Sequence, residues 1–560
     1  MASSVRHAVF FGLMMLAGAV APAFSQAFPG CSEWTMVVPR PADVVGPPWI
    51  DWFVADVARG DGLFVALVFD RSRGALVLTS RDGKTWHEGQ LLTGPERLPL
   101  LVTFAGGKFV AFVGCDEVFV STNAEEWQGG TIGGCADMAE TVWTGSELLA
   151  VGGIGGAIIA SGDGLNWTLR YDGPPPYWVD AQPAGYRPLE SIAWSGSLFA
   201  ASGFLHLVTS TDGGAWAAIQ PPKQTGYDDI TWTGRRFVAV AGGTVMTSTD
   251  GVSWESHAVP NPGAFAPLIW TGADLVARSG ACLYRSADGV TWTADECLPQ
   301  EAFDDFTHLL DFGDVQFAVS NAGLYRRTCS GRGLVLPGAA HVTGVGGSQW
   351  RTDVDLFSIG NTLTTVHVGL HPWGSEGPPA AERTLTLPPG RSLHLDDVVQ
   401  NLFGQEGAAT LTLTPVGGTI TAQARTYADS PAGTYGQFIS AVPDDAAAAA
   451  GDEIWLAGLK QAASDDEGYR TDLGLVNVSH VPVDLTVTFF TPERTELGEL
   501  SYHLRPEESF QITKVLTRVT ADPVLQALAR ITTDTTDGRF LAYASVIDNR
   551  TNDPVYIPGP

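Results

Sequence analysis

The sequence predicts an all-β protein: a seven-bladed β-propeller followed by two tandem β-sandwich domains. Three observations lead to this prediction. A short motif containing Ser, Asp, Gly and Trp recurs six times in the first 330 residues. A second, unrelated duplication with a period of about 119 residues occupies the rest of the chain. Gly (65) and Pro (35) are abundant among the 560 residues, as they are in turn-rich β proteins.

Residues 1–25 are predicted to be a secretory signal peptide. Arg6 precedes an apolar run at 8–20, and Ala21-Pro22-Ala23 offers a small-residue cleavage site. The run is shorter than the roughly 20 residues that span a bilayer. A lipoprotein anchor at Cys31 is the alternative, although the residue two places before it is a proline. We therefore expect a secreted or periplasmic protein that is soluble after cleavage.

The charge balance narrows the choice of partner. Against 32 basic residues stand 61 acidic ones, and the formal net charge is −29. Such a chain repels nucleic acid and anionic lipid, so we expect neither nucleic-acid binding nor membrane insertion. The six cysteines are an even number in a chain predicted to be exported, which favours three disulfides.

The repeated motif is S-x-D-G-x-x-W. Asp and Gly suit a tight hairpin turn, because Gly accepts positive φ and Asp can bond the backbone of the turn. The Trp residues follow one another at intervals of 41, 40, 49, 38 and 38 residues. The five regular copies span 80–86, 161–167, 210–216, 248–254 and 286–292, and a degenerate copy with Asn and Ala spans 121–127.

Each copy has three apolar or alternating stretches before it and one after it, separated by turns. One such unit is a four-stranded sheet that cannot bury both faces alone, so the units must stack. Radial stacking of four-stranded sheets gives a propeller. The motif resembles the Asp-box, or BNR-like, repeat of sialidase-type propellers and photosystem II assembly factor-like proteins. The resemblance covers roughly residues 31–330 and implies the propeller fold.

The two ends of this region complement each other. The strand that should precede a seventh box is present at 323–326, but the repeat then stops at Cys329. The missing half stands at the N-terminus, from Cys31 to Trp34. We therefore predict a seventh blade built from both ends and closed by a Cys31–Cys329 disulfide.

The other four cysteines are placed symmetrically about hairpin turns. Cys282 and Cys297 flank the box at 286–292, and Cys115 and Cys135 flank the degenerate box. Such symmetry places two residues opposite each other on adjacent antiparallel strands. We predict Cys282–Cys297 and Cys115–Cys135 disulfides.

The predicted domains are a propeller at 26–332, a first β-sandwich at 333–442, a linker at 443–452 and a second β-sandwich at 453–560. The segment at 350–354 returns at 469–473 in similar form. Copies of about 105 residues with alternating strands suit Greek-key sandwiches. One short helical turn is expected in each copy, at 396–403 and 513–519. Arg351 with Asp353, and Arg470 with Asp472, are predicted to be paired surface charges.

Acidic side chains recur near the start of the predicted innermost strands. Asp56, Glu140 and Asp229 occupy matching positions, and Glu190 is one place away. Converging carboxylates in a central channel could hold a calcium ion, which needs six to eight oxygen ligands. The alternative is that these acids cap the inner strand as part of the repeat.

Aromatic residues gather in two of the connections between blades. Trp49 and Trp52 lie in one, and Tyr177, Trp178 and Tyr186 in the longest. On the propeller face opposite the boxes, these rings could stack on sugars or anchor a protein. The alternative is that they pack the loops onto the ring.

No catalytic motif is present. The sequence has no G-x-S-x-G, no H-E-x-x-H and no phosphate-binding Gly loop. Arg40, between two prolines, does not match the Arg-containing strand of a sialidase site. The sequence therefore favours an exported, non-catalytic binding or assembly protein whose partner is an extracellular protein or glycan. The alternative is a carbohydrate-active hydrolase resembling a sialidase.

Overall fold

The computed structural model describes residues 31–559, except 42–50, 134–136, 154–155, 174–177, 180–181, 184–188, 204–205, 220–225, 242, 260–264, 280–281, 298–305, 321, 330–332, 345–346 and 431–432. The predicted signal peptide lies outside the described residues. No helix in the described part of the chain is long and apolar enough to cross a membrane.

Residues 35–328 form short antiparallel strands grouped in four-stranded sheets. In chain order the sheets are β2 (Trp52–Gly60), β3 (Leu63–Asp70), β4 (Gly74–Ser80) and β5 (His87–Thr93); β6 (Pro99–Ala105), β7 (Lys108–Val113), β8 (Glu117–Ser121) and β9 (Gln128–Thr131); β10 (Met138–Trp143), β11 (Leu148–Gly152), β12 (Ala157–Ser161) and β13 (Thr168–Tyr171); β16 (Leu189–Trp194), β17 (Phe199–Gly203), β18 (His206–Ser210) and β19 (Ala217–Ile219); β20 (Tyr227–Trp232), β21 (Phe237–Ala241), β22 (Thr244–Ser248) and β23 (Glu255–Ala258); β24 (Phe265–Trp270), β25 (Leu275–Ser279), β26 (Cys282–Ser286) and β27 (Thr293–Cys297); and β28 (Phe306–Asp311), β29 (Val315–Ser320) and β30 (Gly323–Thr328) with β1 (Thr35–Pro39). A small ribbon of β14 (Trp178–Val179) and β15 (Gln182–Pro183) lies between β13 and β16 in the chain.

These sheets form a β-propeller. The first strand of each sheet contacts the first strand of the next, from β2 through β6, β10, β16, β20 and β24 to β28, and β2 in turn contacts β29 and β30. The second strands are continuous apolar runs, and every residue of Phe237–Ala241 is buried. A strand covered on both faces has this pattern because each side chain meets a neighbouring sheet.

The two ends of the propeller region meet in one sheet, as predicted. Strand β1 pairs antiparallel with β30. It is therefore the outermost strand of a sheet whose other strands are β28, β29 and β30. The predicted Cys31–Cys329 disulfide is confirmed. The guanidinium of Arg327 lies 4.4 Å from the ring centroid of Trp34, so these two side chains also stack across the junction.

The other predicted disulfides are described in part. Cys282 stands opposite Cys297 in the register of β26 and β27. Cys115 and Cys282 are both disulfide-bonded. Cys135 lies outside the described residues.

The C-terminal half contains two modules, each with one apolar core. The first module is a continuous sheet that encloses its own core, and the second has two sheets around a common core. The first contains β31 (Leu334–Thr343), β32 (Gln349–Ser358), β33 (Thr364–Pro372), β34 (Ala381–Leu387), β35 (Ser392–Leu395), α2 (Val398–Asn401), β36 (Gly407–Val416), β37 (Ile420–Ser430), β38 (Gly433–Ser440) and β39 (Val442–Pro443). The second contains β40 (Ala448–Ala449), β41 (Glu453–Gln461), β42 (Tyr469–Asn477), β43 (Val483–Phe490), β44 (Glu496–Leu504), β45 (Ser509–Ile512), η4 (Val515–Arg518), β46 (Val524–Thr532), β47 (Arg539–Asp548) and β48 (Pro554–Pro558).

The duplicated segments occupy equivalent places in the two modules. In the first, β32 pairs with β35 and β37; in the second, β42 pairs with β45 and β47. The predicted helical turns are shorter than expected and correspond to α2 and η4. The segment predicted as a linker differs from expectation: it contains the end of β39, the 3-10 helix η3 (Asp444–Ala446) and β40. Strand β39 pairs with β31 and β40 with β47, so this segment belongs to both modules.

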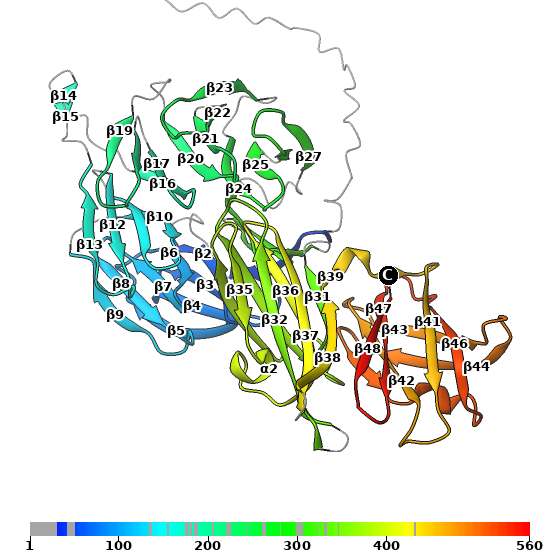
Figure 1. Cartoon of the computed structure of the whole chain (residues 1–560). Coiled ribbons are helices and arrows are strands. Elements are labelled where there is room, and N and C mark those ends of the chain that lie inside the picture. The colour runs from blue at the N-terminus through cyan, green and yellow to red at the C-terminus, as the bar shows by residue number, and fades with distance from the viewer. Residues whose placement is uncertain are drawn as a thin grey trace, which may run out of the picture.

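The first module packs against one end of the propeller sheets (Figure 1). The strands of each sheet follow one another as an antiparallel meander, so the turn between first and second strands lies at the same end as the S-x-D-G-x-x-W segment. We call this the box end and the other the open end. Thr384 exchanges two hydrogen bonds with Asp61 at one such turn. The Trp232 Nε1 donates to the Asn361 carbonyl 3.1 Å away. The first module therefore covers the box end.

Candidate functional site

The S-x-D-G-x-x-W segments form hairpin turns held by one repeated set of hydrogen bonds. In the third sheet, the Ser161 hydroxyl accepts from the Gly164 N–H at 2.8 Å, and the Asp163 carboxylate accepts from the two following N–H groups. The Trp167 indole donates to the Gly164 carbonyl at 2.8 Å. These bonds hold the pKa of the Asp163 carboxyl well below its usual range. The polar groups of the motif are therefore hydrogen-bonded within its own turn.

The degenerate copy keeps the same bonds with different residues. The Asn123 side-chain oxygen accepts from the N–H groups of Glu125 and Glu126 at 3.0 and 3.1 Å. Ala124 takes the place of Gly at a φ of 57°. An amide oxygen is therefore sufficient for this turn, and the negative charge is not required.

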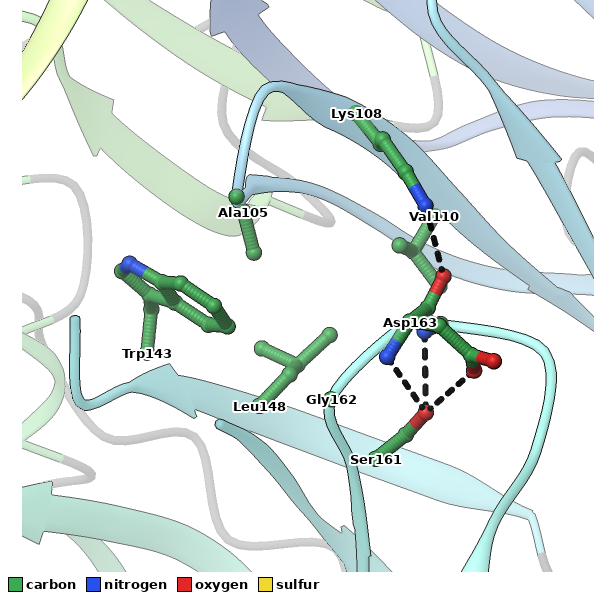
Figure 2. A pocket seen from close by; sticks show the side chains of 10 residues that line it. Ala105, Lys108, Val110, Trp143, Leu148, Ser161, Gly162 and Asp163 are labelled. Carbon is green, nitrogen blue, oxygen red and sulfur yellow. Dashed lines mark hydrogen bonds between the residues drawn. The ribbon is translucent and has the colours of Figure 1, made fainter. Parts of the chain in front are cut away.

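A small cavity lies beside one of these turns (Figure 2). It is bounded by Lys108, Trp143, Leu148 and the turn at Asp163, and its volume is about 50 Å³. The Lys108 ammonium donates to the Asp163 carbonyl at 3.4 Å, which ties one sheet to the turn of the next. A space of this size holds one or two water molecules and is too small for a sugar.

The predicted inner-strand acids reach across to the next sheet. Asp56, on β2, accepts hydrogen bonds from the backbone N–H of Val57 at 2.8 Å and of Val102 on β6 at 3.1 Å. Glu140, on β10, accepts from Ile192 on β16 at 2.9 Å. Each acid lies directly after a register shift in the pairing of the first two strands of its sheet.

Asp229 repeats this arrangement with an extra partner. Its carboxylate accepts from the Ile230 N–H at 2.7 Å and from the Leu268 N–H on β24 at 2.6 Å. The Ser191 hydroxyl donates to it from β16 at 2.8 Å. The acids therefore join neighbouring sheets, a contact that neither the calcium hypothesis nor the strand-capping alternative included.

Burial dominates the acidity of these groups. It raises the pKa of Asp56 to about 7, of Glu140 to about 8 with a further contribution from Asp229, and of Asp229 to about 6. The pKa of Glu190 is also raised by burial and by Asp228. Within the described residues, these carboxylates are not among those whose oxygens are close enough to share one ion, so the geometry does not supply the calcium site considered from the sequence.

The predicted aromatic residues have different outcomes. Trp52 is 5% exposed and packs in the core between the first sheet and the sheet that closes the propeller. It is therefore a packing residue and not a stacking surface. The backbone of Trp178 belongs to β14, which pairs with β15. Trp49, Tyr177 and Tyr186 lie outside the described residues.

A buried ion cluster, which no sequence pattern indicates, joins the propeller to the first module. The Arg59 guanidinium contacts both Glu382 oxygens, at 3.2 and 2.6 Å, and also pairs with Asp314. The side chains of Arg59 and Glu382 are only 8% and 5% exposed. Beside them, burial holds the pKa of His367 well below its usual range. Arg59 and Glu382 are 323 residues apart, so no local pattern could have paired them.

The residues of the predicted surface charge pairs make further contacts; in the second module burial raises the pKa of Asp472 and the charge of Arg470 opposes that shift. Arg351 pairs with Asp429 at 2.7 Å, whereas Asp353 accepts from the Asp397 N–H at 2.9 Å. In the second module, Asp472 accepts from the Lys514 N–H at 2.9 Å. The two aspartates therefore cap the start of α2 and η4, because each accepts from the residue just before the helix.

One group in the described residues has metal-ligand geometry. Asp353, His394 and Asp396 each offer one ligand atom, and these atoms lie within 4.8 Å of one another. The His394 Nδ1 is 2.7 Å from Asp355 and its Nε2 is 3.2 Å from Asp396. A proton on His394 accounts for both contacts, because hydrogen bonding to Asp355 raises the pKa of this imidazole.

Comparison with known proteins assigns no family to the chain. No family model matches it, and no curated protein sequence matches it. Similar solved structures include propeller-type proteins. One is YCF48 bound to D1 peptide, with a TM-score of 0.41 and 18% identity, covering 53% of this chain and 97% of that one. Another is a catalytically inactive virginiamycin B lyase from Staphylococcus aureus with quinupristin, with a TM-score of 0.41 and 11% identity, covering 53% of this chain and 99% of that one. BamB from Moraxella catarrhalis has a TM-score of 0.38 and 12% identity, and the match covers 49% of this chain and 85% of that one. At these values the likeness assigns neither a ligand nor an activity.

Proposed function

We propose that this chain is an exported, non-catalytic binding or assembly protein. Its head is a closed seven-bladed propeller of Asp-box repeats, and two β-sandwich modules follow. The head binds an extracellular protein or glycan at its open end. The observation that carries this proposal is the position of the first module, which covers the box end through contacts at Asp61, Trp232 and Arg59. The turns between second and third strands, and the connections between sheets, are left at the other end.

The inner-strand acids support a binding role over hydrolysis. A glycosidase needs two carboxyl groups free to act as acid and base or nucleophile. Here Asp56, Glu140 and Asp229 each accept backbone N–H groups from the next sheet. Their carboxylates are therefore engaged in holding the sheets together. The alternative, a sialidase-like hydrolase, requires at least one of them to act on a sugar.

A blocking experiment tests the open end. Ser72 is exposed in the turn between β3 and β4, and Ser464 is exposed in a loop of the second module. Ser72→Cys and Ser464→Cys variants of the full chain would each carry a maleimide-linked polyethylene glycol. On glycan and protein arrays, we expect the Ser72 conjugate to lose the binding that the unmodified chain shows. Equal loss by both conjugates, or by the Ser464 conjugate alone, would place the partner elsewhere.

A turnover screen tests the absence of catalysis. The full chain would be incubated with sialosides and other glycosides, and we expect no turnover. Hydrolysis that disappears in Glu140→Gln while the variant keeps its fold would replace the binding proposal with the hydrolase alternative.

A further inference from the structure

A second, larger cavity lies at the seam where the propeller closes. It has a volume of about 430 Å³ and lies between two strands of the closing sheet, β1 and β30, and the first box turn. The lining residues are Ser32, Thr35, Met36, Val37, Lys84, Arg326 and Thr328. Both ionisable side chains in this lining, Lys84 and Arg326, are cationic, in a chain whose formal net charge is −29.

Arg326 and its counterpart Arg285 differ from the rest of the repeat. In the register of second and third strands, the position of Arg326 corresponds to the residue just before the Ser of each box. In five of the other sheets that residue is small or β-branched, namely Thr79, Val120, Ala160, Thr209 and Thr247. The side chain at this position meets the box glycine of the next sheet, as Val120 meets Gly164 and Arg326 meets Gly83. A long cationic side chain is therefore not needed to build this contact.

Arg326 forms no hydrogen bond or ion pair with the described residues, although the charges of Asp314 and Asp82 act on it from farther away. The residue is 9% exposed, and its Nε is buried without a hydrogen bond. Its counterpart in the neighbouring sheet, Arg285, pairs with Asp274 at 2.8 Å and with Asp295 at 3.4 Å. A buried guanidinium nitrogen without a hydrogen bond costs free energy. Burial lowers the pKa of Arg326, and the charges of Asp314 and Asp82 partly oppose this shift.

The nearest carboxylates are committed to other groups. Asp82 accepts from the Lys84 and Thr85 N–H groups, each at 2.8 Å, within its own turn. Asp314 pairs with Arg59. Lys84 likewise forms no ion pair with any described residue. The residues that line the cavity therefore include two cationic side chains and no carboxylate, while the nearby Glu507 carboxylate of the second module interacts electrostatically with Lys84.

We propose that this cavity binds an oxyanion, the carboxylate or phosphate group of a small ligand. Arg326 offers the planar fork that matches two oxygens of either group. Lys84 adds a second charge from the exposed turn. Hydroxyl groups of Ser32, Thr35 and Thr328 line the same space. The volume is within the range of small-molecule sites. The site lies at the box end, away from the proposed partner surface, so either can fail without the other.

Titration calorimetry on the full chain tests this proposal. The titrants are inorganic phosphate and succinate, each at an ionic strength held constant with chloride. We expect saturable binding of at least one anion. Arg326→Met should weaken it about tenfold or more, because it removes a charge-assisted hydrogen-bond donor. Lys84→Gln should weaken it by a smaller factor. Arg81→Gln is the matched control, because Arg81 is exposed in the same turn but does not line the cavity.

The outcomes separate a site from general charge attraction. Binding of phosphate or of succinate that depends on Arg326 and Lys84 but not on Arg81 supports the site and identifies the preferred anion. No saturable binding of either anion overturns the proposal. Equal weakening by Arg81→Gln and Lys84→Gln also overturns it. Lys84→Gln changes only an exposed turn, so it keeps the test valid if Arg326→Met does not fold.

Discussion

The propeller and the two C-terminal modules distribute their apolar cores differently. In the propeller, buried residues fall into separate clusters, each shared by neighbouring sheets. Each C-terminal module has one larger cluster of its own. A sheet that shares its core depends on both neighbours, so the propeller is stable only as a closed ring, as in other stacked-repeat proteins. A module with its own core does not depend on closure.

The same contrast explains where the covalent and ionic links are found. The described cysteines lie in the propeller, and one disulfide joins residues 298 positions apart. The two modules contain no cysteine, and the first is joined to the propeller by buried polar contacts around Arg59 and Glu382. Five changes test this difference between the propeller and the modules.

Removal of the closing disulfide should have the largest effect. Cys31→Ser with Cys329→Ser frees a loop of 298 residues, which by chain entropy costs roughly 5 kcal/mol, although measured values are often smaller. We expect the propeller's melting temperature to fall more than after replacement of Cys282 and Cys297 by Ser. Scanning calorimetry measures both. An equal or smaller decrease for the Cys31 and Cys329 pair would show that closure does not depend on this link.

Loss of the Arg59 side chain should be the next largest effect. Arg59→Met leaves Glu382 and Asp314 without their partner, and breaking a buried ion pair costs about 3 to 5 kcal/mol. The control is Arg97→Met, because the pair of Arg97 with Asp116 is exposed at 39% and 41% and such pairs contribute about 1 kcal/mol or less. Chemical denaturation gives both values. Similar values for the two variants would argue against a buried junction.

The inner-strand acids should make the propeller less stable as pH rises. Burial raises the folded-state pKa of Glu140 to about 8, from an ordinary value near 4.5. The stability that its protonation contributes is fully present below pH 4 and is lost as pH rises through about 8. We expect Glu140→Gln to recover about 4 kcal/mol at pH 9 relative to pH 5. Glu126→Gln, at an exposed position, should leave the pH profile of the melting temperature unchanged.

A box aspartate should have a smaller effect and the opposite pH dependence. Asp250 accepts from the Val252 and Ser253 N–H groups, which lowers its pKa to about 2. Its contribution is therefore present above about pH 4 and lost as pH falls through about 2. We expect Asp250→Ala to cost about 1 kcal/mol at pH 7. Asp250→Asn should cost less, because Asn123 forms the same turn. A larger cost for Asn than for Ala would contradict this reading.

Removal of the propeller should have the smallest effect on the modules. Residues 333–560 retain both large clusters and the contacts between the two modules, such as Thr410 with Ser509 at 2.9 Å. We expect this fragment to unfold cooperatively in a thermal scan. A fragment that shows no transition would mean that the propeller contributes to the module cores.

The sequence by itself determined the features that repeat or that lie close together in the chain. The box turns depend on residues within seven positions, so the pattern S-x-D-G-x-x-W was enough to predict their hairpins. The pairing of β1 with β30 followed from the period, because a repeat that stops halfway at Cys329 and starts halfway at Cys31 leaves one consistent closure. The equivalent registers of β32 and β42 followed from the duplication in the same way.

The tertiary structure alone decided what each polar or aromatic side chain faces. Trp52 and the inner acids looked like site residues because their types suit binding, but their partners belong to other sheets. The cluster of Arg59 with Glu382, and the unpaired charge of Arg326 beside Lys84, arise only when distant segments meet. Hydrogen bonds and ion pairs act over a few ångströms, whereas these partners are hundreds of residues apart in the chain. A linear pattern therefore identifies the groups but not their surroundings.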